Sequence, residues 1–337
     1  MKERETWLDY IRAIACFLVA FIHFVESMIK AGLIDCTNFF NVLERTVYFF
    51  PVPIFFFCSG YLYQKGQPVD SISSYIKNVK NKLINLGIPY IFFTFVTIVS
   101  KKLMGDSVNT PINRKAWEYF LVSPPGQMWF LIILILCFMV IPTMNRRNFW
   151  IIVLGGSAAK ILALTGVIYY IQIVEMEIFS YAIWFIGGMA VCYKQIKPDK
   201  KWVFLGMLVL PVMVIAYLSE QRNLFLQSLL SFLGIIFLSG VCVCLKNKHR
   251  ILLILSKYML QIYLLHTMCA ACVRIMLLRL SINNAFIHVT IGLLSSFVGP
   301  ILIAIILRKS KLGNIIFFPT KTWEQLRGRI RKSEREL

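Results

Sequence analysis

Acidic residues are scarce in this chain: of its 337 residues, 16 are Asp or Glu, whereas 36 are Lys or Arg. Charged residues of both signs make up only 15% of the chain, 58% is hydrophobic, and the mean hydropathy is +0.71. Soluble globular domains carry about 25% charged residues, so this composition excludes an ordinary soluble protein. It indicates a polytopic membrane protein, whose net charge of +20 reflects topology and contact with anionic lipid.

The chain also lacks the common motifs of several enzyme classes. It contains no P-loop, no G-x-G-x-x-G and no G-x-S-x-G, so none of these motifs explains its function. The basic residues are spread over separate loops and form no single patch, which argues against nucleic-acid binding. The C-x-x-C of Cys269 and Cys272 lies in an apolar segment without further ligands, so we expect no metal site there.

The apolar segments predict an all-α fold, a polytopic bundle of about ten transmembrane helices. The expected spans lie near residues 7–29, 41–63, 83–100, 128–145, 149–168, 178–193, 202–219, 224–245, 251–273 and 284–307. An even number of spans puts both termini on one side, and the distribution of Lys and Arg makes that side the cytoplasm. We expect residues 1–310 to form the membrane domain and residues 311–337 to form a basic cytoplasmic tail.

The first span carries four ionisable residues, which are costly inside a bilayer. They are Asp9, Arg12, His23 and Glu26. At 100° per residue they fall within an arc of about 100°, whereas scatter would spread them around the helix. Snorkelling near the helix ends is the alternative for Asp9 and Glu26. His23 lies roughly 24 Å along the helix from Trp7, so this face of the helix is a candidate functional site.

The second span ends in a polar segment, Ser59, Gly60 and Tyr61. A glycine here permits the close approach of a ligand, which would make the segment part of a binding site. It equally permits close contact with the backbone of a neighbouring helix. The sequence leaves both interpretations of Gly60 open.

Three lysines stand just before the third span: Lys77, Lys80 and Lys82. Clustered ammonium groups suit a polyanion, so they are candidates for binding phosphates on the cytoplasmic side. The alternative is that they only anchor the topology, as the positive-inside rule requires.

A second histidine lies at a depth that matches that of His23. His266 is about 21 Å along the ninth span from its cytoplasmic end, at 1.5 Å per residue. Tyr263 shares its face of the helix, and Trp129 opens the fourth span at a similar level. A packing histidine and a tryptophan of the interfacial belt are the alternatives. The combination indicates a substrate site.

Five segments of the chain resemble, in order, the signature segments of the acyltransferase family 3 integral membrane proteins: WLDYIRAIACFLVAFIHF, FFPVPIFFFCSGYLY, MWFL, IWFIGGM and IYLLH. The resemblance covers about residues 6–307. Its most specific element is a basic residue followed, after ten others, by a histidine, here Arg12 and His23. The family's other functional positions match Ser59, Gly60, Tyr61, Trp129 and His266.

This resemblance implies transfer of an acyl group, typically acetyl, from cytoplasmic acyl-CoA to a hydroxyl of a cell-envelope or lipid-linked glycan. Arg12 and the lysines would hold the phosphates of acetyl-CoA, while His23 acts as general base or carries the acyl group itself. Glu26 or Asp9 would orient the site or balance its charge. The protein would be a multi-pass protein of the cell membrane, as in the bacterial cytoplasmic membrane.

Two features depart from the family pattern. The lysine cluster replaces an arginine-rich motif, and Met259 replaces the serine common before the IYLLH segment. The ammonium group of a lysine is a point charge and lacks the two parallel donors with which an arginine guanidinium binds a phosphate. A proton-coupled transporter of a small polar substrate or of the acyl donor stays the alternative function, since intramembrane Arg, His and Glu suit that role too. Release of CoA would distinguish the enzyme from the transporter.

Overall fold

A computed structural model describes residues 5–35, 38–42, 46–66, 71–166, 177–219, 223–245, 249–320 and 322. Every regular element within these ranges is helical, which confirms the predicted all-α class. Residues 323–337, which hold most of the predicted basic tail, lie outside the described residues.

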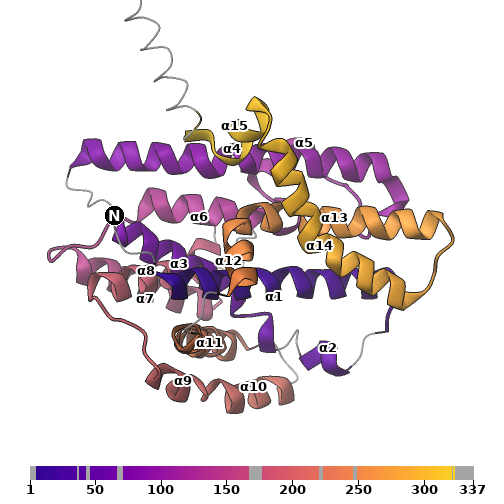
Figure 1. Cartoon of the computed structure of the whole chain (residues 1–337). Coiled ribbons are helices and arrows are strands. Elements are labelled where there is room, and N and C mark those ends of the chain that lie inside the picture. The colour runs from indigo at the N-terminus through magenta and orange to yellow at the C-terminus, as the bar shows by residue number, and fades with distance from the viewer. Residues whose placement is uncertain are drawn as a thin grey trace, which may run out of the picture.

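The helices follow one another along the whole described chain (Figure 1). They are α1 (Thr6–Lys30), α2 (Asn38–Val42), α3 (Pro51–Lys65), α4 (Ile72–Met104), α5 (Ala116–Leu121), α6 (Trp129–Val140), α7 (Phe149–Leu164), α8 (Glu177–Tyr193), α9 (Lys201–Gly206), α10 (Val209–Leu218), α11 (Leu224–Cys244), α12 (Arg250–Lys257), α13 (Met259–Arg279), α14 (Ala285–Leu307) and α15 (Lys311–Phe317). Within the described residues, six segments are long and apolar enough to cross a membrane: α1, α4, α9 with α10, α11, α13 and α14. Helices α6, α7 and α8 are apolar but shorter. The protein is therefore a polytopic helical membrane bundle.

Several predicted boundaries are wrong, and local chemistry explains where the helices begin. The second span begins at Pro51 instead of residue 41, because proline fits the first helical position, where no backbone donor is needed. The third begins at Ile72 instead of residue 83, behind a capping box in which the Ser71 hydroxyl accepts from the Ser74 amide at 3.2 Å. The lysine cluster therefore lies on a helix and not before one.

Two predicted spans are interrupted. The seventh divides into α9 and α10, and the ninth divides at Tyr258 into α12 and α13. Figure 1 shows α12 turned steeply across the direction of α13. After the bend at Tyr258, α12 packs against the beginning of α1.

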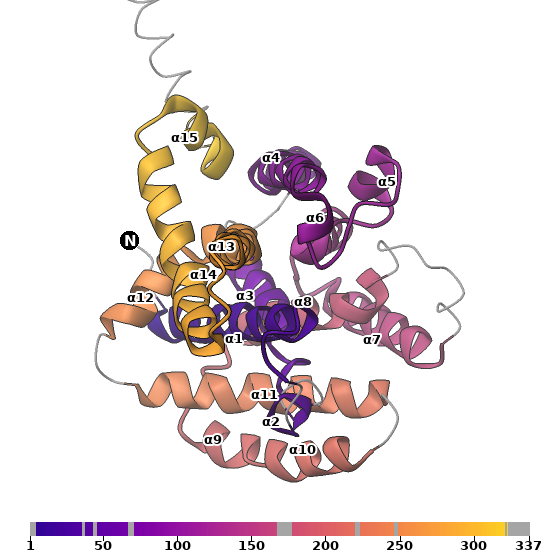
Figure 2. The ribbon, with the colours of Figure 1, turned by 90° about the vertical axis from the view of Figure 1, so that its right-hand side faces the viewer.

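Helix α1 lies in the middle of the bundle (Figure 2). It packs against α3, α11, α12, α13 and α14. Most of its side chains on the apolar faces are buried, and they belong to a core shared with α3, α6, α8 and α13. The charged face of α1, in contrast, is only partly buried.

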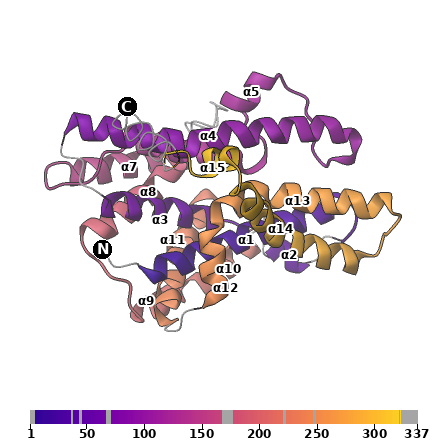
Figure 3. The same cartoon turned by 45° about the horizontal axis from the view of Figure 1, so that its top comes forward.

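Helix α4 lies at the edge of the bundle, where Figure 3 shows it beside α15 and α5. Its main helical contacts are with α5, α6 and α15. The Thr320 hydroxyl donates to Asn85 Oδ1 at 2.8 Å, and Phe317 is buried against Phe93. The first turns after residue 310 thus pack on the bundle, while the boundary of the tail stays a prediction.

Candidate active site

Helix α1 carries two acid–base pairs with the same spacing. The Arg12 guanidinium lies 3.8 Å from Asp9 Oδ1, and His23 Nδ1 lies 3.5 Å from Glu26 Oε2. Residues three apart are neighbours on a helix surface, so each pair follows from local geometry. The rise from Arg12 to His23 is about 16.5 Å, which keeps the two pairs apart. Asp9 therefore does not contact His23, and Glu26 is the carboxylate that lies next to this imidazole.

The structure brings His23 and His266 together, as their matching depths predicted. Their ring centroids are 5.7 Å apart, and the rings are inclined by 31°. The Tyr48 ring stands perpendicular to His23 at 6.3 Å. The side chain of His23 is 27% exposed, whereas His266 is 1% exposed. One imidazole is thus accessible and the other is enclosed.

Hydrogen bonds determine which nitrogen of His266 carries the proton. Its Nδ1 lies 2.9 Å from the Ile262 carbonyl oxygen and 3.0 Å from that of Tyr263. Carbonyl oxygens only accept, so Nδ1 is the donor and Nε2 keeps a lone pair. Nε2 is buried and has no hydrogen-bond partner within the described chain. An unsatisfied buried acceptor costs stability, so this atom is a candidate contact for a hydroxyl of a substrate.

Gln127 fixes the start of α6 to the turn of α13 that holds His266. The Tyr263 hydroxyl donates to the Gln127 carbonyl. In return, Gln127 Nε2 donates to the Tyr263 carbonyl at 3.0 Å and to Thr267 Oγ1 at 3.2 Å. Trp129, the first residue of α6, places its ring 5.2 Å from Tyr181. Trp129 and Tyr263 therefore lie at the hydrogen-bonded junction of α6 and α13, on the turn next to His266.

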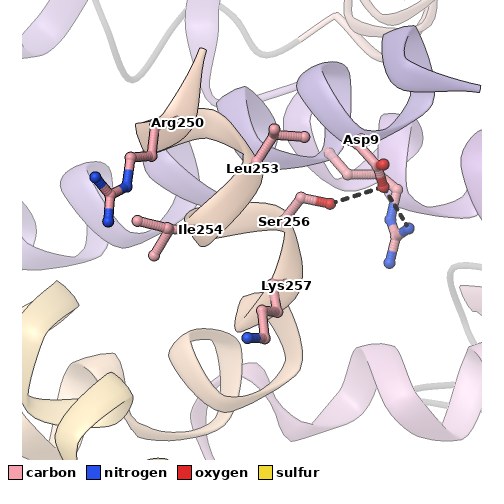
Figure 4. Close-up of a pocket in the computed structure, with 7 residues that line it drawn as sticks. Asp9, Arg250, Leu253, Ile254, Ser256 and Lys257 are labelled. Atoms are coloured by element: carbon pink, nitrogen blue, oxygen red, sulfur yellow. Dashed lines mark hydrogen bonds and ion pairs between the residues drawn. The ribbon is translucent and has the colours of Figure 1, made fainter. Parts of the chain in front are cut away.

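A cavity of about 490 Å³ lies between the beginning of α1 and α12. It is lined by Asp9, Arg12, Arg250, Leu253, Ile254, Ser256 and Lys257. The Ser256 hydroxyl donates to Asp9 Oδ1 at 3.0 Å, and Figure 4 shows Ser256 pointing toward this carboxylate. Asp9 is thus part of a basic cavity at the predicted cytoplasmic end. The interpretation of Asp9 as a partner of His23 finds no support in these contacts.

The residues at the end of the second span join α3 to its neighbours. A Cβ on Gly60 would lie 1.9 Å from the Phe185 carbonyl oxygen of α8, so α3 and α8 touch through their backbones. The Tyr61 hydroxyl donates to Glu5 Oε1 at 3.1 Å. Ser59 is half-buried nearby. Of the two interpretations of Gly60, close helix contact is the one that the structure shows.

Glu5 ties the start of α1 to the end of α3. It accepts from Lys65 Nζ at 2.7 Å and from Trp7 Nε1 at 2.7 Å, besides the bond from Tyr61. Burial raises the pKa of Glu5, but the hydrogen bonds from Lys65, Trp7 and Tyr61 outweigh it, so that the pKa is lowered from its ordinary value of 4.5. The ionised carboxylate stabilises this end of the bundle.

The three lysines of α4 do not form one cluster. Lys77 and Lys80 are exposed, whereas Lys82 is half-buried with its Nζ 4.5 Å above the Phe138 ring. Their helix packs mainly on α5, α6 and α15, so its main contacts do not bring them to the cavity at Arg12. The cations that line the cavity together with Arg12 are Arg250 and Lys257.

Sequence reasoning missed four residues of the site: Tyr48, Gln127, Arg250 and Ser256. One signal was present for Arg250, because it stands seven residues before Lys257 and the two fall within about 20° on a helix. Nothing local marks Tyr48 or Gln127, whose contacts come from segments far away in the chain.

The comparisons with known proteins identify the family of the chain. A family model described as an acyltransferase domain matches residues 5–305, which is most of the chain. No curated protein and no solved structure matches the chain. The match includes both acid–base pairs of α1, the segment around Gly60, the start of α6 and His266. The chain therefore belongs to the acyltransferase family 3 of integral membrane proteins.

Proposed function

We propose that the protein moves an acyl group, typically acetyl, from cytoplasmic acyl-CoA to a hydroxyl of a cell-envelope or lipid-linked glycan. The contact between His23 and His266 is the observation that carries this proposal. It puts an accessible imidazole with a carboxylate partner next to a buried imidazole whose Nε2 has a free lone pair. Such a pair suits the activation of a hydroxyl group.

The arrangement along α1 suits a long donor that enters from one end. Arg12 lines the basic cavity, and His23 lies about 16.5 Å further along the same helix. An extended pantetheine arm has a comparable reach. Phosphates held at the cavity would therefore leave the thioester near His23.

The chemistry follows from the two imidazoles. His23 removes the proton of the acceptor hydroxyl as its oxygen attacks the thioester carbonyl carbon. The carbon–sulfur bond breaks, and the thiolate of CoA takes the proton back from the imidazolium. In the covalent variant, an unprotonated nitrogen of His23 attacks the thioester carbon and the thiolate of CoA leaves. The acceptor hydroxyl then attacks the acyl-imidazole, its proton passes to the thiolate, and His23 is regenerated. Glu26 orients His23 in either case, since it is the carboxylate next to it.

The remaining residues have supporting roles in this proposal. His266 Nε2 accepts a hydrogen bond from a neighbouring hydroxyl of the glycan, one that does not react, and Trp129 with Tyr263 forms the wall beside it. On the donor side, exposed Lys77 and Lys80 raise the local concentration of an anionic donor, and Lys82 adds to the same field. Ser59, Gly60 and Tyr61 shape the end of α3 near the donor's entry.

The test uses inverted membrane vesicles that contain the full chain and acetyl-CoA labelled in the acetyl group. We expect release of the CoA thiol together with label in the glycan or lipid-linked sugar fraction. His23→Ala should abolish both, by a factor of about 10² to 10⁴ for a lost general base. Binding of acetyl-CoA to the purified variant should change little, because His23 lies far from the cavity.

The control is His249→Gln, an exposed histidine on the loop before α12. It should keep full activity, which shows that replacing a histidine does not by itself disturb folding. Uptake or export of a substrate without CoA release would contradict the enzyme and favour the transporter.

A further inference from the structure

Among the described residues, the lining of the basic cavity between α1 and α12 carries more positive than negative charge. Its lining contains three basic side chains and a single carboxylate, that of Asp9. Arg250 and Lys257 are exposed, and neither makes an ion pair within the described chain. Like charges that share one face of a helix repel each other unless an anion lies between them. The cavity therefore suits an anionic ligand.

The cations are distributed along the cavity and do not converge on one point. Figure 4 shows Arg250 and Lys257 pointing away from Asp9, whereas Ser256 points toward it. Arg12 lies at the Asp9 side, 3.8 Å from its carboxylate. Arg12 thus lies on the Asp9 side of the cavity, while the side chains of Arg250 and Lys257 point away from it, so the arrangement suits a ligand with phosphates at two separate positions.

We propose that Arg250 and Lys257 bind the 3′-phosphate of the CoA donor while Arg12 binds its pyrophosphate. The donor itself rests on the proposed function. The order follows from the geometry: the pyrophosphate joins the pantetheine arm to the adenosine, so it belongs beside Arg12 on the helix that leads to His23. The 3′-phosphate is further from the thiol and belongs at the α12 end. A volume of about 490 Å³ is within the usual range of small-molecule sites.

Asp9 acts in this site as a counter-charge that the ligand displaces. Its contact with Arg12 is longer than a hydrogen bond, and the Ser256 hydroxyl donates to the same carboxylate oxygen, Oδ1, at 3.0 Å. A pyrophosphate offers Arg12 more charge and more acceptor atoms than this carboxylate does. Ligand binding exchanges the Asp9 contact for phosphate, and Ser256 keeps Asp9 in place meanwhile.

The experiment measures binding to the full chain in nanodiscs of neutral phosphatidylcholine, by calorimetry with CoA and with 3′-dephospho-CoA. We expect the wild type to bind CoA at least tenfold more tightly than 3′-dephospho-CoA. The double variant Arg250→Gln/Lys257→Gln should lose this preference and bind the two ligands about equally. Arg12→Gln should weaken both ligands alike and keep the preference.

The matched control is Lys309→Gln/Lys311→Gln, which removes two exposed charges after α14. It should leave both affinities unchanged. Asp9→Asn should tighten both ligands, because it removes the competing charge and keeps an acceptor for Ser256. The assignment would be overturned if the α12 double variant lost affinity equally for CoA and 3′-dephospho-CoA. It would also be overturned if Asp9→Asn bound both ligands more weakly than the wild type.

An anionic headgroup is the rival ligand for these cations, and the nanodisc separates the two. Two results together would show that the cavity binds an anionic lipid. Phosphatidylglycerol in the nanodisc would abolish CoA binding by the wild type. The Arg250→Gln/Lys257→Gln variant would retain less of this lipid and would keep its preference for CoA over 3′-dephospho-CoA. A preference that survives the double variant while acetyl transfer continues would refute this site and leave the proposed function intact. Loss of the preference in a protein that releases no CoA thiol would keep the site and refute the function.

Discussion

The imidazole rings of His23 and His266 face each other across α1 and α13, with centroids 5.7 Å apart. Each ring is held by a different kind of partner. His23 meets the Glu26 side chain, whereas His266 is fixed by two backbone carbonyls. A side-chain partner can move with its residue, but a helical backbone cannot. His266 is therefore the rigid member of the pair, and His23 is the adaptable one.

Replacing His266 should affect turnover and leave the donor site unchanged. His266→Gln removes the Nε2 lone pair from its present position. Loss of one hydrogen bond at a buried site costs about 1–3 kcal/mol, which corresponds to a fall in turnover of about five- to 150-fold. Acetyl-CoA affinity, measured by calorimetry, should stay within a factor of two of wild type. A parallel loss of donor affinity would contradict the separation of the two sites.

Glu26 is expected to contribute modestly to turnover. Its carboxylate lies 2.5 Å from Lys30 Nζ and 3.5 Å from His23 Nδ1, and its side chain is 37% exposed. Exposed ion pairs are worth about 0.2–1 kcal/mol, so Glu26→Gln should lower turnover by less than about tenfold. Lys30→Gln is the control, because it removes the other partner and keeps the contact with His23. If both variants lost turnover equally, the ion pair between Glu26 and Lys30 would act by stabilising the structure and not through His23.

Substituting the glycine between α3 and α8 should destabilise the protein. In Gly60→Ala the new methyl would lie 1.9 Å from the Phe185 carbonyl oxygen, so the two helices must separate. Overpacking of this kind costs about 1–3 kcal/mol or more, which lowers the unfolding temperature in detergent. Gly87→Ala in α4 is the matched control. Its Cβ would meet no atom within 4 Å, so its stability should be unchanged or slightly raised.

The ion pair at Glu5 should make stability depend on pH. Its pKa is lowered in the folded protein, because hydrogen bonds from Lys65, Trp7 and Tyr61 outweigh the effect of burial. A lowered pKa means that the stabilisation is present above the ordinary value of 4.5 and is lost as pH falls below it. The unfolding temperature of the wild type should therefore fall on acidification more than that of Glu5→Gln. Identical pH profiles would remove Glu5 from the stabilising contacts of α1 and α3.

The sequence determined the features that depend on near neighbours along the chain. Hydropathy alone indicated a helical membrane bundle, and the 3.6-residue period placed Asp9, Arg12, His23 and Glu26 on one face of α1. The two pairs at three-residue spacing followed directly, since such residues meet on any helix. The segments around Arg12 and His23 also carried the family resemblance that the match over residues 5–305 confirms.

Only the tertiary structure decided which helices meet and where they bend. Apolar residues stand on both sides of Tyr258, and the expected span 251–273 joined them, so hydropathy did not locate the bend between α12 and α13. It also could not show that Lys77 and Lys80 lie on a peripheral helix while Arg250 and Lys257 line the cavity. Such contacts depend on side chains and glycines from distant segments fitting together, as Gly60 does against Phe185. Periodicity within one helix carries no information about that fit.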